Sequence, residues 1–148
     1  MAAIVSSTEI SRSPEEVFRY ATDPARLPEW QESAVATRVE GEGPIAVGSR
    51  LVVTRRVGRR EIPMTTEVTT YDPPSRWAGR GVDGPVRGIF GGTVESVEGG
   101  TRSRVTIELD FEGHGLGKLL VPLVVRPQAR KEMRRNMESL KAHLERGT

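Results

Sequence analysis

The fold of this chain is decided by residues 105–124, which read VTIELDFEGHGLGKLLVPLV. Apolar and polar residues alternate from Val105 to Glu112, and this alternation predicts a β-strand with one buried face. After the glycine-rich segment 113–117, large apolar residues recur at i, i+3, i+4, i+7 and i+8, a spacing that predicts an amphipathic helix. The stretch therefore predicts the last strand of a sheet, followed directly by a helix that covers it.

The predicted helix extends from about Leu116 to Glu145. Pro122 predicts irregular geometry in its first part, and Pro127 predicts a kink or an interruption. Its second part continues the apolar stripe through Met133, Met137, Leu140 and Leu144.

Upstream of this stretch, the sequence predicts a meander of antiparallel strands. A period of two begins after Ser33, and turn residues such as Gly41-Glu42-Gly43-Pro44 and Asp83-Gly84-Pro85 separate the strands. The predicted strands of the meander are Ala34–Glu40, Ser49–Val57, Glu61–Tyr71, Arg76–Gly81, Val86–Val97 and Thr101–Glu112.

The N-terminal part supplies one more strand, Ala2–Ile10, and two short helices. Ser13-Pro14-Glu15-Glu16 provides an N-cap, a proline at the first helical position and acids in the first turn. Asp23-Pro24 ends this helix, and Ala25–Trp30 predicts the second one. We expect an α+β fold in one domain over residues 1–148, with a seven-stranded curved antiparallel sheet wrapped around a long C-terminal helix.

Composition excludes several kinds of chemistry. The 148 residues include no Cys and two His, so disulfides, thiolate nucleophiles, iron–sulfur clusters and a three-His zinc site are impossible. Because 22 basic and 20 acidic residues are interspersed, we expect no nucleic-acid partner. The N-terminus does not resemble a signal peptide, and the apolar run Leu119–Val125 is too short to span a bilayer. We expect a cytoplasmic bacterial protein, monomeric or homodimeric, with no stable membrane insertion, metal or cofactor.

The chain contains five short motifs whose order and spacing match those of a known family. They are Ile10–Phe18, Asp23-Pro24 with Leu27–Trp30, Val47-Gly48-Ser49, Tyr71–Trp77 and Gly99–Arg102. Together they resemble the SRPBCC or helix-grip superfamily, which includes START domains, birch-pollen-allergen-like proteins and polyketide cyclase/dehydrase and lipid-transport proteins. The similarity covers essentially the whole chain, and its motifs specify fold rather than activity. The resemblance implies a cavity for an apolar ligand between the sheet and the long helix.

We expect inward-facing residues of the sheet and the helix to line this cavity. Glycines 79, 81, 88, 91 and 92 add little volume to the central strands, which favours unfilled space under the helix, although a filled core stays an alternative. The expected ligand-binding residues are Trp30, Leu51, Val53, Met64, Thr66, Val68, Trp77, Phe90, Ile107, Leu109 and Phe111, with Leu120, Leu123 and Val124 as a lid and Met133 and Met137 as adaptable contacts.

Arg55 and His114 are the two weak candidates for catalysis. Arg55 has the same strand parity as Leu51 and Val53, but it is close to the Gly58 turn, where we expect it to reach solvent. The alternative is an inward guanidinium that binds a carboxylate or phenolate. His114 lies in a glycine-rich segment without an evident partner, which favours an exposed loop.

The remaining polar candidates are expected at the surface. Glu108, Asp110 and Glu112 share one strand face, which we interpret as solvated rather than as a metal cluster, and His143 lies on the polar side of the last helix.

Three functions remain compatible with the sequence. We rank first the binding or transport of a hydrophobic small molecule such as a lipid, a quinone or a polyketide. The second is a cyclase or dehydratase acting on an aromatic polyketide precursor, with His114, Arg55, Tyr20, Tyr71 or water supplying acid–base chemistry. The third is an interaction protein with a filled core. An inward-facing ionisable pair would favour the enzyme.

Overall fold

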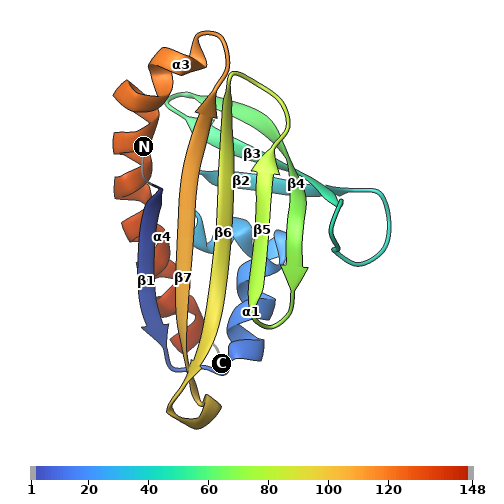
Figure 1. Ribbon diagram of the computed structural model, residues 1–148, viewed down its shortest axis with the longest axis vertical. Helices are drawn as coiled ribbons and strands as arrows, with labels where there is room; N and C mark the ends of the chain where they lie inside the picture. Colours follow the sequence, from blue (N-terminus) through green and yellow to red (C-terminus); the bar gives the residue numbers. More distant parts are fainter. Residues whose placement is uncertain (1–2, 147–148) are drawn as a thin grey trace.

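A curved antiparallel sheet lies against a long C-terminal helix in the computed structural model, which describes residues 3–146 (Figure 1). The sheet order is β1-β7-β6-β5-β4-β3-β2, so that β1 and β2 are its two edges. The strands are β1 (Ile4–Ile10), β2 (Ala34–Glu40), β3 (Arg50–Val57), β4 (Arg60–Asp72), β5 (Arg76–Gly81), β6 (Val86–Val97) and β7 (Arg102–Gly113). The predicted fold class is confirmed, and the predicted position Ala2 lies outside the described residues.

Helical segments lie after β1, between β6 and β7, and in the C-terminal part of the chain. They are α1 (Pro14–Thr22), a 3-10 turn (Pro24–Arg26), α2 (Leu27–Trp30), a 3-10 turn (Glu98–Gly100), α3 (Gly117–Leu120), a π-helical turn (Val121–Val125) and α4 (Arg126–Arg146). As predicted, Ser13 is the N-cap of α1. Its Oγ accepts the N–H of Glu16 at 3.3 Å, and Glu16 Oε1 accepts the N–H of Ser13 at 3.5 Å, which completes a capping box.

The inner face of the sheet is closed at one end by buried apolar side chains. Ile10, Val94 and Val105 of the sheet join Val17 and Phe18 of α1 in one cluster. From α4 the cluster receives the predicted stripe of Met133, Met137, Leu140 and Leu144, all buried. We call this part of the inner face the closed end. Helix α4 reaches it by packing against β1, α1 and α2.

Two aromatic rings occupy the space that glycines leave on the central strands. A Cβ atom on Gly92 would collide with the ring of Trp77, and one on Gly79 would collide with the ring of Phe90. Trp77 also stands edge-on to Phe18, with ring centroids 5.8 Å apart. The expectation that these two glycines leave unfilled space is therefore wrong, because side chains from the neighbouring strand cover them.

The start of the C-terminal helix is irregular, as its prolines predict. Pro122 cannot donate a backbone hydrogen bond, and the N–H of Arg126 bonds Val121 O in a π-helical turn. Gly117, Val121 and Arg126 are buried on the side that faces the sheet. Gly117 sets this orientation because a Cβ atom there would collide with the carbonyl of Pro85.

An ion pair fixes the N-terminus of α4 to the sheet. Arg126 Nη1 donates to Asp110 Oδ1 at 2.6 Å, one residue beyond the last β1–β7 register pair, Ile4 with Leu109. The hydrogen bond from the Phe111 N–H lowers the pKa of the Asp110 carboxyl most. Burial acts in the opposite direction, and the Arg126 guanidinium lowers this pKa further. Asp110 was expected on a solvated face, and its side chain is still 37% exposed; the sequence did not predict that the buried Arg126 of α4 would pair with it.

Replacing Gly92 with Ala is expected to destabilise the fold by about 1–3 kcal/mol, because the new methyl group must displace the Trp77 ring. Urea unfolding measures the change. Gly91→Ala is the matched control, since a Cβ there meets the Trp77 carbonyl oxygen and the Ala78 Cβ at ordinary contact distances of 3.5 and 3.7 Å. Equal losses in the two variants would contradict the packing described above.

Replacing Asp110 with Asn is expected to remove a pH-dependent part of the stability. Because the folded pKa of Asp110 lies below the unfolded value of about 3.9, its contribution is present above that pH and is lost as the pH falls through the folded pKa. The difference in unfolding free energy between wild type and variant should therefore shrink in acid. Glu112→Gln, at an exposed position on the same strand, is the control. A difference that does not change with pH would refute this role.

Candidate functional site

The strand register decides which side chains share the inner face. Leu51 pairs with Thr66 and Val53 with Met64 between β3 and β4, while Phe90 pairs with Leu109 between β6 and β7. Directly paired residues lie on the same face of a sheet. The register therefore brings the predicted lining residues of four strands to one side, which is the side of α4.

Part of this inner face remains accessible. Its half-buried residues are Leu51, Met64, Thr66, Phe90, Leu109 and Phe111; Trp77 is half-buried as well, but its ring packs edge-on to Phe18 of the closed end. On β6 and β7 they lie nearer to the point at which β7 leads into α3 (Figure 1). We call this part the accessible end. Apolar inward-facing side chains that solvent can still reach are what a ligand-binding interior requires.

The other predicted lining residues fall into a buried and an exposed group. The buried ones are Trp30, Val53, Val68, Ile107, Met133 and Met137. Leu120, Leu123 and Val124 are exposed, at 44%, 74% and 58% of their surface. The expectation that they form a lid facing the sheet is corrected, because the contact of Gly117 with Pro85 turns the opposite side of this helical segment inward.

A polar cluster lies where β3, the end of α2 and α4 meet. Arg55 Nη1 donates to Ser33 Oγ at 3.0 Å, and Nη2 donates to Gln31 Oε1 at 2.8 Å. Ser33 Oγ in turn donates to Glu132 Oε2 of α4 at 2.8 Å. Asn136 Nδ2 donates to the same oxygen at 3.4 Å. These five side chains are called the polar cluster below.

Arg55 is therefore drawn inward, where the sequence favoured a position in solvent. It is half-buried, and burial lowers the pKa of its guanidinium while the negative charge of Glu132 acts in the opposite direction. Partly desolvated charges interact more strongly than charges in water. The cluster thus places an arginine and a carboxylate of opposite charge next to an apolar interior.

Trp30 adds an unsatisfied donor beside this cluster. The residue is 5% exposed, and its indole Nε1 is buried without a hydrogen-bond partner among the described residues. A buried N–H without an acceptor costs about 1–3 kcal/mol. The structure thus retains a donor that a carbonyl or hydroxyl oxygen of a ligand could satisfy.

The other titratable candidates lie outside the polar cluster. His114 is exposed, and its backbone N–H donates to Pro85 O at 2.7 Å. Tyr20 donates to Glu29 Oε1 at 2.9 Å, and burial together with this hydrogen bond raises the pKa of its phenol. His143 was expected on the surface but is half-buried, with its ring stacked on Tyr20 at a centroid distance of 6.4 Å.

The sequence analysis did not select Glu132 or Asn136 as candidates, although one pattern in the sequence marks them. Glu132, Asn136 and Ser139 follow each other at i, i+4 and i+7, immediately beside the stripe that begins at Met133. A polar stripe next to an apolar one is usually solvated. The hydrogen bond between Ser33 and Glu132 depends on the packing of α2 against α4, which the sequence pattern does not show.

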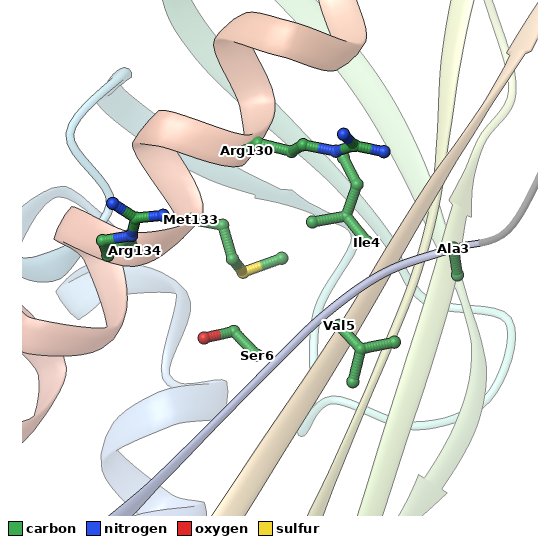
Figure 2. A pocket seen from close by; sticks show the side chains of 7 residues that line it. All are labelled: Ala3, Ile4, Val5, Ser6, Arg130, Met133 and Arg134. Atoms are coloured by element: carbon green, nitrogen blue, oxygen red, sulfur yellow. The ribbon is translucent and has the colours of Figure 1, made fainter.

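Two hollows flank the helix on its outer sides. One of about 310 Å³ lies between β1 and α4 and is lined by Ala3, Ile4, Val5, Ser6, Arg130, Met133 and Arg134. Figure 2 shows Met133 pointing from α4 toward β1 and Arg130 extending over Ile4. The other, of about 280 Å³, is lined by residues of α2 and α4 that include Trp30, Gln31 and Asn136. Within residues 3–146, His, Asp and Glu side chains form no group of three that could hold a metal ion.

An antiparallel sheet that wraps around a C-terminal helix and keeps part of its apolar inner face accessible defines the class of START-like helix-grip proteins. A family model described as polyketide cyclase / dehydrase and lipid transport matches residues 1–145. The chain belongs to this family, which binds hydrophobic small molecules. No curated protein matches the chain in sequence.

Solved structures share the fold at low sequence identity. The chain is similar to the di-domain ARO/CYC BexL from the BE-7585A biosynthetic pathway, with a TM-score of 0.76 and 17% identity over 98% of this chain. It spans 47% of that protein, about half of its length. It is also similar to TTHA0849 from Thermus thermophilus, with a TM-score of 0.71, 21% identity, and coverage of 97% and 94% of the two chains. A START superfamily protein from Mycobacterium smegmatis has a TM-score of 0.71 and 15% identity over 98% and 95%.

Replacing Glu132 with Gln is expected to destabilise the protein by about 1–3 kcal/mol, because Arg55 loses its nearby negative charge. The double variant Arg55→Met/Glu132→Gln should lose less unfolding free energy than the two single variants lose in sum. A double-mutant cycle by urea unfolding measures this coupling. Glu138→Gln, at an exposed position of α4, should be nearly neutral. Strict additivity of the two substitutions would show that Arg55 and Glu132 do not interact.

Proposed function

We propose that this protein binds a hydrophobic small molecule at the accessible end of the inner face, against Met64, Phe90 and Phe111. The observation that carries the proposal is that inward-facing apolar residues there are half-buried, whereas those of the closed end are buried. Burial of ~300 Å² of apolar ligand surface would contribute up to about 7 kcal/mol before ordering costs. Membership in a family of lipid-transport and polyketide-acting proteins supports the same conclusion.

The polar cluster specifies the other end of the ligand. Arg55 offers positive charge to a carboxylate, phenolate or similar oxyanion, and the free indole N–H of Trp30 offers a neutral donor. We therefore propose an amphipathic ligand, whose apolar body contacts the accessible end and whose oxygen-bearing end lies at the cluster.

Two dyes that share an apolar skeleton test both parts of this proposal. Anilinonaphthalene sulfonate carries a negative charge, and phenylnaphthylamine is the same skeleton without it. Met64→Trp should weaken the binding of both dyes by roughly tenfold, because the indole fills the space at the accessible end. Fluorescence titration measures the affinities. Unchanged binding of both dyes by a folded Met64→Trp variant would contradict a ligand at this position.

Arg55→Met should weaken only the charged dye, by about tenfold or more, since the apolar contacts remain. Arg38→Met is the matched control, because Arg38 is exposed and lies on the outer face of β2. Equal weakening of the two dyes in Arg55→Met would show that Arg55 supports the fold rather than the ligand.

A cyclase or dehydratase remains the second candidate, and one observation favours it. Arg55 and Glu132 form an inward-facing ionisable pair joined through Ser33. A carboxylate can remove a proton from the acidic carbon between two ketones, and an adjacent guanidinium can stabilise the enolate that forms. For a reactive polyketone, Glu132→Gln should then lower turnover by roughly a hundredfold, while Glu138→Gln should not. Full turnover in Glu132→Gln would remove this candidate.

The proposal also includes a cytoplasmic location, a monomeric or homodimeric state and no nucleic-acid partner. Within residues 3–146, every helix is too short or too polar to span a lipid bilayer. Sedimentation velocity of the purified protein determines the oligomeric state.

A further inference from the structure

An apolar surface lies on the outer side of the segment that joins β7 to α4. It consists of Leu116, Leu119, Leu120, Leu123 and Val124, which are between 44% and 77% exposed. We call it the leucine surface. Scattered exposed leucines are ordinary in soluble proteins, but five large apolar residues within nine positions form a contiguous patch that normally has a binding role.

The leucine surface is held in its outward orientation at both ends. On the N-terminal side, the His114 N–H donates to Pro85 O, and the backbone of Gly117 rests against the same carbonyl. On the C-terminal side, the buried Arg126 is paired with Asp110. Because Gly117 and Val121 occupy the inner side of the segment, the leucines cannot turn inward without breaking these contacts.

Positive charge accompanies the leucine surface. Residues 113–131 contain no Asp or Glu, and besides the buried Arg126, which pairs with Asp110, they include Lys118, Arg130 and Lys131. Lys118, Arg130 and Lys131 are exposed, and the side chain of Arg130 leaves α4 and extends over Ile4 of β1 (Figure 2). An apolar patch next to basic side chains is suited to the interface of an anionic bilayer, where leucines enter the acyl boundary and cations meet phosphates.

We propose that the leucine surface docks reversibly on anionic membranes. A second copy of the chain fits this surface less well, because an isologous contact would bring the lysines and arginines of both copies together. An anionic lipid surface satisfies the apolar and the basic residues at once. Docking in this way would bring the end of the molecule at which β7 leads into α3 to the bilayer (Figure 1). It does not depend on which ligand the interior holds.

Co-sedimentation with vesicles tests the apolar part of the docking. The full chain should bind vesicles of phosphatidylcholine mixed with phosphatidylglycerol and bind pure phosphatidylcholine vesicles much less. The variant Leu119→Ser/Leu123→Ser should lower partitioning by about tenfold or more, because two inserted side chains are lost. Val47→Ser is the control, since Val47 is 65% exposed in the loop before β3.

Charge reversal tests the basic part. Arg130→Glu/Lys131→Glu should lower partitioning by more than about tenfold, given a factor of roughly five for each basic residue near an anionic surface. Arg38→Glu/Arg80→Glu makes the same change of charge at exposed positions elsewhere on the sheet, and its effect should be much smaller. Equal losses in the two double variants would show a non-specific charge effect and would overturn the proposal.

Two further outcomes would overturn it. The first is an absence of binding to anionic vesicles by the unaltered protein. The second is a dimer in solution that dissociates on Leu119→Ser/Leu123→Ser, which would assign the leucine surface to a second copy. Titration of the same variants with phenylnaphthylamine keeps the two proposals apart. If dye binding persists while vesicle binding is absent, the ligand site stands and the docking is refuted.

Discussion

The structure depends on one constraint, which is that α4 covers only part of the inner face of the sheet. Its stripe of Met133, Met137, Leu140 and Leu144 is buried against β1, α1 and α2. Among the strands, α4 contacts mainly the edge strand β1, and the accessible end is left without a complete cover. Both the candidate ligand site and its polar boundary follow from this partial coverage.

The polar cluster is placed at this boundary for a physical reason. A charged side chain that faces the interior of a sheet must find partners, because its desolvation is costly. Arg55 finds them in Gln31 and Ser33, which follow α2, and through Ser33 in Glu132 of α4. The same contacts join the sheet, the short helices and the long helix. A ligand that binds here would meet groups whose positions three elements fix, and such preorganisation favours specificity.

The irregular geometry at the start of the C-terminal helix lets its first part turn apolar residues outward while its second part turns them toward the sheet. Pro122 and the π-helical turn allow the segment to follow the end of the sheet before α4 begins. The Asp110–Arg126 pair then fixes the junction. As a result the leucines before Arg126 face outward, whereas the apolar stripe that begins at Met133 faces inward. One helical pattern in the sequence thus serves two different surfaces.

Local patterns in the sequence specify the order of the elements and most of their limits, because alternation, caps and turn residues act over a few positions. Ser13 with Glu16 and the Val105–Glu112 alternation are examples that the structure confirms. Three other features depend on how the elements pack together: the inward position of Arg55, the pairing of Asp110 with Arg126, and the outward side of the leucine surface. Each depends on contacts between residues far apart in the chain. Periodicity shows that a helix has two sides, but the backbone contact of Gly117 with Pro85 decides which side meets the sheet.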